Sequence, residues 1–314
     1  MHLLKSILFF LPLAVFGQGP FAPVAQQTGS SAIKSDSSII SGWISNCIIH
    51  RGYLDYAQPA LGYASYSDSS AAIGIADNNV VSLGDSGYAE ILFDPPLADQ
   101  SGYDFAIFEN SFSDTYLELA FVEVSSDGQH FVRFPAVCLT QDSLQLGSFG
   151  STDPTHIHNL AGKYRANFGT PFDLNALKDS SNITLNSITH LRIVDVIGAI
   201  NQTFTSFDSQ GNQVNDPYPT NFASGGFDLD AVALLFPQTV SLPEISHSNL
   251  FYPNPSKGQI SFSPDIHSCK VYSLNGSLLY EYQEDLQTIS LSSGTYILEM
   301  ISAEEHIFEK LVVL

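Results

Sequence analysis

The sequence predicts an all-β protein in two parts, a large sandwich or barrel followed by a small sandwich. Helical periodicity is almost absent, and short alternating or apolar runs recur between turn signals. Phenylalanine and tyrosine are abundant, with 22 and 14 residues, while 14% of the residues are charged. This composition fits a β-rich extracellular protein better than a helical cytosolic one. With 314 residues the chain has room for a large and a small domain.

The chain is strongly acidic. It carries 32 Asp and Glu residues against 11 Lys and Arg residues, for a formal net charge of −21. Such a surface repels phosphate backbones and anionic lipid, so we expect no nucleic-acid partner and no attachment to membranes through basic patches. Divalent cations and neutral ligands are the partners that this charge favours.

Residues 1–17 have the features of a secretory signal peptide. Lys5 is followed by the apolar run ILFFLPLAVF, and the small residues Val15 and Gly17 stand where a cleavage site requires them. The run is about half as long as the ~20 residues that a membrane-spanning helix needs, and no later segment of the sequence approaches that length. We therefore expect an exported protein that begins at Gln18.

Cysteine usage gives little information about the fold. Cys47, Cys138 and Cys269 allow at most one disulfide, and no pair has the C-x-x-C spacing of a zinc or redox site. Isolated buried thiols are the favoured interpretation, and a Cys47–Cys138 bridge is the alternative.

The large domain, expected over residues 18–237, shows its strand signals after residue 80. The clearest runs are VVSLG, YAEILFD, DFAIFEN, LELAFVEVSS, HFVRFPAV, ITHLRIVDVIG and FDLDAVALLF. Asp127-Gly128 lies between two of these runs and indicates a hairpin. Residues 140–187 are rich in loop signals, with one short helix expected near residues 172–178. Loops of this length inside a compact domain are usually functional.

Two aspartates interrupt the last strand of the large domain. Strict alternation places Asp228 and Asp230 on one face, with Phe227, Leu229, Ala231, Ala233 and Leu235 on the other. A buried charge needs a partner, so these carboxylates predict a cation, a set of hydrogen bonds or a wet groove. Together with Asp104 and Glu109 of DFAIFEN they form the best candidate for calcium, which binds six to eight oxygens. The alternative is that one aspartate accepts backbone N–H groups while the other is solvated.

Other side chains of the loops are weaker candidates for ligand or metal binding. Tyr218 and Phe222 follow the loop DSQGNQVNDPYPT, which lacks the spacing of a calcium-binding loop and is better suited to recognition through aromatic stacking. Tyr164 and Arg165 are candidates for lining a ligand pocket. His156 and His158 would point the same way on an extended segment, as a transition-metal pair requires, but two ordinary loop histidines are the alternative reading.

A domain boundary falls near residues 237–250, where the strand pattern stops and proline and serine accumulate. We expect a linker over residues 238–249 and a second domain over residues 250–314. Asn275-Gly276 marks a hairpin in this domain, and Ser293-Gly294 precedes the run TYILEMIS. Short strands over about 65 residues predict a small sandwich.

The second domain resembles the type A C-terminal sorting domain of the type IX secretion system of Bacteroidota-type bacteria. The resemblance spans nearly the whole domain in order, through VYSLNGSLL, LSSGTYIL and the residues Tyr252, Pro253, Asn254, Pro255, Gly258, Gly276, Gly294 and Lys310. It implies an immunoglobulin-like sandwich, a partnership with the type IX secretion machinery, and a protein released from or attached to the outer surface of a Gram-negative bacterium.

Residues 80–236 resemble a family of secreted bacterial cell-surface proteins. The shared runs are VSLGDSGYAEILFD, GYDFAIFENSF, LELAFVEVSSDGQHFVRFPA, NLAGKYRANFGTPFDL, LRIVDVIG, DSQGNQVNDPYPT and SGGFDLDAV. Some relatives sit beside outer-membrane receptors for corrinoids, which implies ligand capture and a receptor as a partner. The run FDLDAV is also similar to the last strand of galactose-binding-like jelly rolls, in which an acidic residue ligates structural calcium. This likeness implies a jelly-roll-like sandwich.

The sequence favours a secreted, surface-displayed, non-catalytic ligand-binding protein, such as one that captures a corrinoid. It contains neither the G-x-S-x-G nor the H-E-x-x-H motif of hydrolases, and no pair of carboxylates can be placed across a cleft. The alternatives are a carbohydrate-binding module and a structural or adhesive surface protein. A small-molecule binder should have a concave, aromatic-lined site, whereas an adhesive protein should have a broad flat patch.

Overall fold

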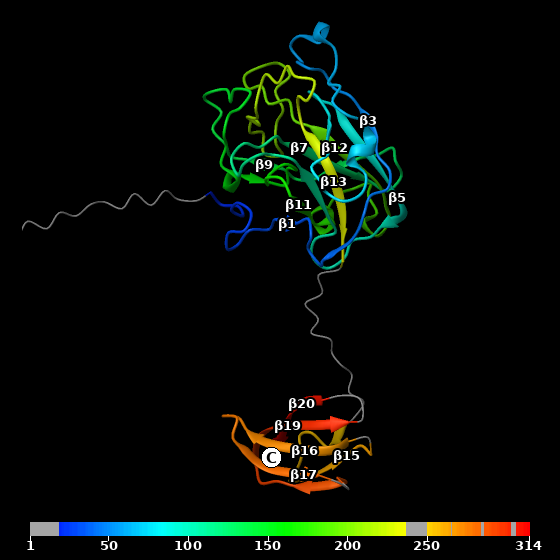
Figure 1. Ribbon diagram of the computed structural model, residues 1–314, viewed down its shortest axis with the longest axis vertical. Helices are drawn as coiled ribbons and strands as arrows, with labels where there is room; N and C mark the ends of the chain where they lie inside the picture. The colour runs from blue at the N-terminus through cyan, green and yellow to red at the C-terminus, as the bar shows by residue number, and fades with distance from the viewer. Residues whose placement is uncertain (1–18, 237–249, 265, 284–285, 303–305) are drawn as a thin grey trace, which may run out of the picture. The chain divides into compact units, whose positions relative to one another are not determined.

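The computed structural model describes residues 19–236, 250–264, 266–283, 286–302 and 306–314 (Figure 1). The predicted signal peptide and linker lie outside these residues. The described chain forms two compact units, separated where the linker was predicted. Its regular elements are β-strands and short 3-10 helices, so the predicted all-β class is confirmed. None of the described helices is long and apolar enough to cross a membrane.

The large unit contains two antiparallel sheets. The first has the order β1 (Ile33–Lys34), β11 (Phe168–Phe172), β6 (Phe105–Glu109), β13 (Asp228–Leu235) and β2 (Ile40–Trp43), with β4 (Val81–Ser82) also paired to β13. The second has the order β3 (Ile48–His50), β5 (Tyr88–Leu97), β12 (Ile188–Asp195), β7 (Ala120–Ser125) and β8 (Val132–Arg133). A separate ladder joins β9 (Val137–Cys138) to β10 (Ile157–His158).

Five 3-10 helices lie in the connections of the large unit: η1 (Pro59–Leu61), η2 (Ser69–Ala72), η3 (Pro154–His156), η4 (Leu174–Leu177) and η5 (Leu185–Ser187). The short helix expected near residues 172–178 is therefore present as η4. Asp173 caps it by accepting a hydrogen bond from the Asn175 N–H at 2.9 Å, which satisfies a donor that the first turn leaves free.

One hydrophobic core joins the two sheets of the large unit. Phe105 and Phe172 of the first sheet stack at 5.4 Å between ring centroids, and Phe134 meets the Phe172 ring edge-on at 5.1 Å. Ile91 and Leu191 of the second sheet are fully buried in the same cluster. Side chains from two facing sheets thus fill a common interior, as a sandwich requires.

A β-bulge changes the predicted faces of β13. Leu229 pairs with Glu109, but Ala231 pairs with Phe108, so β13 contains one extra residue at Asp230. After the bulge the alternation is inverted: the core between the sheets contains Phe227, Leu229, Val232 and Leu234, whereas Ala231, Ala233 and Leu235 pack on the opposite face. The prediction that all five odd-numbered residues share a face was therefore wrong beyond Asp230.

The cysteines confirm the favoured interpretation. All three are free and buried, so the alternative Cys47–Cys138 bridge is not formed. Burial raises the pKa of the Cys47 thiol to about 12, which keeps it protonated and unreactive at neutral pH.

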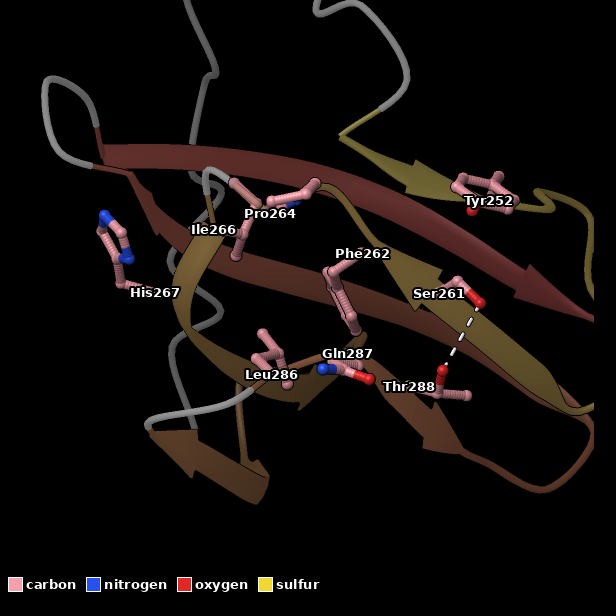
Figure 2. Close-up of a pocket in the computed structure, with 9 residues that line it drawn as sticks. All are labelled: Tyr252, Ser261, Phe262, Pro264, Ile266, His267, Leu286, Gln287 and Thr288. Atoms are coloured by element: carbon pink, nitrogen blue, oxygen red, sulfur yellow. Dashed lines mark hydrogen bonds between the residues drawn. The ribbon is translucent and has the colours of Figure 1, made fainter.

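The second unit is a small sandwich of two antiparallel sheets. Their orders are β14 (Phe251–Tyr252), β15 (Gln259–Phe262) and β18 (Thr288–Ser290), and β17 (Leu278–Gln283), β16 (Ile266–Ser273), β19 (Gly294–Ser302) and β20 (His306–Val313). Ile260, Val271 and Leu298 lie in its core. A pocket of about 800 Å³ lies beside β15 and β18, and Phe262 and Leu286 are among the residues that line it (Figure 2).

Candidate cation and ligand sites

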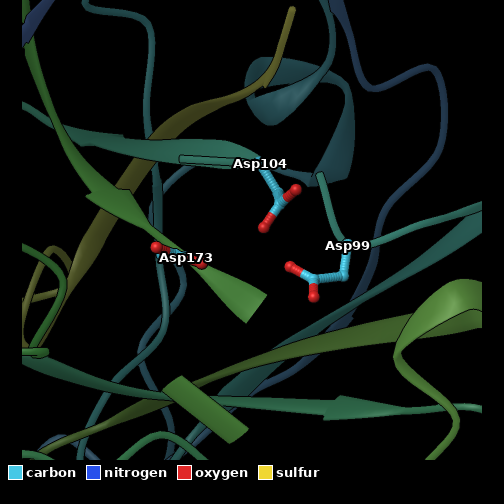
Figure 3. Close-up of side chains that lie close together, drawn as sticks. All are labelled: Asp99, Asp104 and Asp173. Atoms are coloured by element: carbon cyan, nitrogen blue, oxygen red, sulfur yellow. The ribbon is translucent and has the colours of Figure 1, made fainter. Parts of the chain in front are cut away.

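Three aspartates meet at one end of β6. Asp99 follows β5, Asp104 immediately precedes β6, and Asp173 immediately follows β11, the strand that pairs with β6. One carboxylate oxygen from each lies within 4.8 Å of the others, and Figure 3 shows Asp99 and Asp104 turned toward each other. Such a group of hard oxygen ligands could hold a metal ion.

Asp104 is held by the backbone around it. Its two carboxylate oxygens accept hydrogen bonds from the Gln100 N–H at 2.9 Å and the Leu174 N–H at 2.7 Å. Burial raises the pKa of Asp104 to about 6, and the charges of Asp99 and Asp173 act in the same direction. A cation in this group would remove that repulsion between the three carboxylates.

The other predicted metal ligands do not join Asp104. Glu109 is the last residue of β6 and lies at the opposite end of that strand. Asp228 accepts a hydrogen bond from the Ser82 hydroxyl, while Asp230 accepts from the Asp77 and Asn78 N–H groups, both at 3.1 Å. The structure therefore distributes the four predicted carboxylates over separate environments, although the charge of Asp228 acts on Glu109.

Sequence reasoning missed further buried acids near Glu109. Glu118 precedes β7, Asp195 ends β12, and Asp216 lies in the connection between β12 and β13. Burial, the largest cause, raises the pKa of Glu118 well above its usual range, and the charges of Glu109, Asp228, Asp216 and Asp195 act in the same direction. The available signal was an acid inside an apolar run, as in LELAFVEV and RIVDVIG.

The four predicted ligand-binding residues separate into two locations. Tyr164 is buried, with its hydroxyl 2.8 Å from the Ser31 hydroxyl, and Arg165 forms an ion pair of 2.8 Å with Asp114. Tyr218 donates a hydrogen bond of 2.6 Å to Asp55, whereas the nearby Phe222 is exposed. Only the second pair contributes to a larger aromatic surface.

A row of four aromatic rings lies on the loops of the large unit. Ring centroids are 5.0 Å apart for Phe112 and Tyr116, 6.2 Å for Tyr116 and Phe149, and 5.9 Å for Phe149 and Phe222. The planes of neighbouring rings differ by 9°, 32° and 30° along the row. We call these four residues the aromatic row. Of these four residues, only Phe222 was predicted from the sequence.

A second aromatic group lies next to the segment 218–223. Tyr53 and Tyr63 stack at 4.9 Å, and Phe204 lies 5.2 Å from Tyr56 and 6.4 Å from Tyr218. Tyr53, Tyr56 and Tyr63 come from the tyrosine-rich stretch that follows His50. The Ala223 carbonyl accepts hydrogen bonds from the N–H groups of residues 65 and 66, so this stretch lies against the segment that carries Phe222.

The two loop histidines lie in different surroundings. His156 lies 3.7 Å from Asp153 and borders a pocket of about 370 Å³, whereas His158 stacks on Phe21 at 5.0 Å. Burial lowers the pKa of His158. In the part of the chain that the structure describes, the aspartate group beside β6 is the one set of three or more potential ligands close enough for a shared ion.

Two residues of the predicted sorting motif, Asn254 and Lys310, are joined by a hydrogen bond between the beginning and the end of the second unit. Asn254 accepts a hydrogen bond of 3.0 Å from the Val312 N–H and donates one of 2.7 Å to the Lys310 carbonyl. Gly258 and Gly276 have φ of +111° and +82°, values that favour glycine. Asn254 thus ties the β14–β15 connection to the last strand.

Residues 250–314 match the family described as the secretion system C-terminal sorting domain. This match confirms the predicted sorting domain and, with it, secretion or surface attachment in a Gram-negative bacterium and an interaction with the secretion machinery. No curated protein matches the chain in sequence.

Solved structures with limited similarity to the chain include β-glucuronidases of Ruminococcus gnavus, Faecalibacterium prausnitzii and Lactobacillus rhamnosus. Their sequence identities are 10%, 12% and 8%, with TM-scores of 0.19, 0.16 and 0.17. The matches cover 73%, 73% and 88% of this chain but 36%, 37% and 46% of those chains, so this chain spans less than half of their length. TM-scores this low carry no argument about fold or function.

Proposed function

Since residues 250–314 are a sorting domain for export, we propose that residues 19–236 form a non-catalytic ligand-binding module that acts outside the cell and contacts its ligand through the aromatic row. The exposure of that row is the observation that supports the proposal. Phe112, Phe149 and Phe222 are 78%, 72% and 46% exposed, although they are large apolar side chains. Contiguous exposed apolar surface is typical of interaction sites.

Hydrogen bonds between the loops support a row that is ordered before a ligand arrives. The Ser148 hydroxyl donates to the Pro219 carbonyl at 2.7 Å, joining the segments that carry Phe149 and Phe222. The Thr152 N–H donates to the Thr115 carbonyl at 2.7 Å, joining the segments of Phe149 and Tyr116. A site fixed in this way loses less conformational entropy when it binds.

The open position of the row favours an extended ligand, and we propose an oligosaccharide chain. The pocket of about 370 Å³ in the neighbouring loops is lined by residues such as Thr140, Gln141 and Asp153, without a phenylalanine, tyrosine or tryptophan side chain. None of the four rings of the aromatic row lines this pocket. Capture of a corrinoid, with delivery to an outer-membrane receptor, is the second candidate, and adhesion is the third.

A binding role without catalysis is supported by the burial of Glu118, the acid whose charge acts most strongly on Tyr116 of the row. Glu118, whose charge acts on Tyr116, is 7% exposed. A glycosidase needs two carboxylates held across an open cleft that admits the sugar. The low exposure of Glu118 gives a bound sugar little access to this carboxylate.

Calcium is the ion that we propose for Asp99, Asp104 and Asp173. Calcium prefers carboxylate and carbonyl oxygens and tolerates irregular geometry, which suits three acids from two different connections. The Asp99 Oδ1 atom is buried and has no hydrogen-bond partner among the described residues, so it is available as a ligand.

Isothermal titration of the purified protein against soluble polysaccharides, cobalamin and calcium tests these proposals. We expect a polysaccharide to bind and the Phe149→Ala/Phe222→Ala variant to bind it at least about tenfold more weakly, because each buried ring contributes more than about 1 kcal/mol. Phe207→Ala is the matched control, since Phe207 is also exposed but lies outside the row. Equal binding by both variants would contradict the assignment, and heat with cobalamin alone would favour the second candidate.

A further inference from the structure

The pocket of about 370 Å³ lies next to the aromatic row in the sequence and in space. Its walls belong to the connection between β9 and β10, and its lining residues are Leu139, Thr140, Gln141, Leu146, Ser151, Thr152, Asp153 and His156. The same connection carries Phe149, whose ring belongs to the row. Two residues span at most about 7 Å, so the backbone of Ser151 lies close to the backbone that presents the Phe149 ring.

Hydrogen bonds join the pocket to the segments that carry the other rings. The Thr152 N–H donates to the Thr115 carbonyl at 2.7 Å, next to Tyr116 of the row. The Leu146 carbonyl accepts from the Tyr218 N–H at 3.1 Å, in the segment that leads to the last ring of the row. A chain-like ligand that lies on the rings can therefore continue into the pocket.

The walls of the pocket are fixed by backbone contacts. The Leu139 N–H donates to the His156 carbonyl at 2.8 Å, which closes the two ends of the connection on each other. The Thr155 hydroxyl accepts from the Gly19 N–H at 2.8 Å, and the Thr155 carbonyl accepts from the Phe21 N–H at 3.0 Å. A pocket held in this way loses less conformational entropy when it binds a ligand.

Asp153 presents a carboxylate to the pocket in a fixed orientation. Its Oδ1 atom caps η3 by accepting from the Thr155 N–H at 2.9 Å and the Thr155 hydroxyl at 2.7 Å. Its Oδ2 atom lies 3.7 Å from the His156 Nδ1 atom, which is beyond hydrogen-bond distance, and the Asp153 side chain is 52% exposed. One oxygen therefore positions the group, and the other is open to a ligand.

Asp153 also gives the pocket a negative charge. Burial acts to raise the pKa of Asp153, but the hydrogen bonds from Thr155 and the charges of His156 and Lys163 outweigh it and lower the pKa below its usual value. The Lys163 ammonium group donates to the Ile157 carbonyl at 2.8 Å. Among the described residues, those that line the pocket include neither lysine nor arginine. Such a pocket accepts hydrogen bonds from hydroxyl groups and repels an anionic ligand.

We propose that this pocket is a subsite for one uncharged hexose residue of an extended, β-linked chain on the aromatic row, and that it rejects uronic acids. A sugar hydroxyl donates to the Asp153 Oδ2 atom, and the Ser151 and Thr152 hydroxyls line the same pocket. Leu139 and Leu146 offer apolar contact to the sugar ring. The volume lies in the range of small-molecule sites. This inference rests on the proposed function and names the class of sugar that the site selects.

Isothermal titration of the intact protein with hexasaccharides at pH 7.5 tests the subsite. The neutral probes are cellohexaose and β-mannohexaose. The anionic probes are the hexamers of β-linked glucuronate and mannuronate, which differ from the neutral ones by a carboxylate in place of the hydroxymethyl group. The test variant Asp153→Asn keeps the cap of η3, because asparagine caps helices as well as aspartate does. The matched control Asp142→Asn removes an exposed acid of the same connection that does not line the pocket.

We expect the wild type to bind a neutral hexamer at least about tenfold more tightly than the matching uronate hexamer, because like charges repel in the pocket. Asp153→Asn should bind the neutral hexamer at least about tenfold more weakly, since a hydrogen bond to a charged group is lost. The same variant should bind the uronate hexamer no more weakly than the wild type does. A merely structural role of Asp153 would weaken both, and Asp142→Asn should leave the wild-type preference unchanged.

Three results would overturn the subsite. They are equal binding of the neutral hexamer by Asp153→Asn and the wild type, a uronate hexamer that binds the wild type as tightly as its neutral counterpart, and no heat with either neutral hexamer. The proposed function is decided separately, by the polysaccharide titration and the Phe149→Ala/Phe222→Ala variant. A protein that binds polysaccharide through the row but gives any of the three results would retain that function without the subsite.

Discussion

Replacing Gly162 with alanine measures how tightly the chain is packed around Glu118. Gly162 has φ +81°, in the left-handed region, and an added Cβ would lie 1.8 Å from the Glu118 carbonyl oxygen. That carbonyl cannot withdraw easily, because the adjacent Ala120 and Ala161 exchange two backbone hydrogen bonds of 3.1 and 2.9 Å. The substitution therefore combines a backbone strain with a direct collision.

Gly211 separates these two effects. It has φ +85°, but an added Cβ would find no atom within 4 Å. The left-handed conformation costs a residue with a Cβ about 1–2 kcal/mol, so we expect Gly211→Ala to lower the free energy of unfolding by about 1 kcal/mol. At Gly162 the new Cβ also collides with the Glu118 carbonyl oxygen. We therefore expect Gly162→Ala to lower the free energy of unfolding by more than about 4 kcal/mol.

Fluorescence of Trp43 during urea unfolding is the assay. The chain contains 1 tryptophan, which lies in β2 of the large unit, so the signal reports on that unit alone. For a domain of this size, about 1 kcal/mol corresponds to about 2–4 °C in melting temperature. Equal losses of stability in the two variants would refute the reasoning, because they would show that the collision is relieved without cost.

Three further predictions follow from single side chains. Burial lowers the pKa of Lys163 from 10.5 to about 8, so the folded protein loses this proton at lower pH than the unfolded chain does. The free energy of unfolding should therefore rise by about 3 kcal/mol between pH 8 and 10.5. Urea titrations should show this rise in the wild type but not in Lys163→Met. Phe172→Ala should cost about 3–5 kcal/mol by the same assay, since Phe172 is fully buried against Phe105 and Phe134. Asn254→Ala removes two hydrogen bonds, so it should destabilise the second unit by about 1–2 kcal/mol, as measured by calorimetry. The control Gln259→Ala changes an exposed side chain and should leave the stability of this unit unchanged.

Strand composition and turn signals were sufficient to predict the class and the two units. Most of the apolar runs named from the sequence contain a strand of the structure, and the runs around Asn275-Gly276 became β16 and β17. Each of these signals is local, because alternation and turn chemistry depend on neighbours in the chain. The sorting domain was predictable for the same reason, since its residues recur in order along 65 positions.

The candidate cation sites were harder to predict because they depend on contacts between distant segments. Asp104 and Glu109 are five residues apart, and a strand rises about 3.3 Å per residue, so about 16 Å separates them and one ion cannot bind both. That arithmetic was available from the sequence. The meeting of Asp99 with Asp173 was not, because it depends on the pairing of β6 with β11.

The aromatic row shows the same difficulty in the loops. Phe112, Phe149 and Phe222 are 37 and 73 positions apart in successive steps, and only the folded connections bring their rings together. Loop aromatics have no periodicity that would identify a shared face. Phe222 was predicted because it follows a proline-rich loop, whereas Phe112 and Phe149 had no comparable signal.

The bulge at Asp230 makes the identity of the core residues in β13 depend on a count rather than on a composition. Core positions 227, 229, 232 and 234 are separated by two, three and two residues, so the strand changes phase once in its middle. Deleting Asp230 would remove the bulge and restore strict alternation, with Phe227, Leu229, Val232 and Leu234 still facing the core and Ala231 and Ala233 still on the opposite face. A related chain could therefore lack this one residue and still place the same apolar side chains in the core.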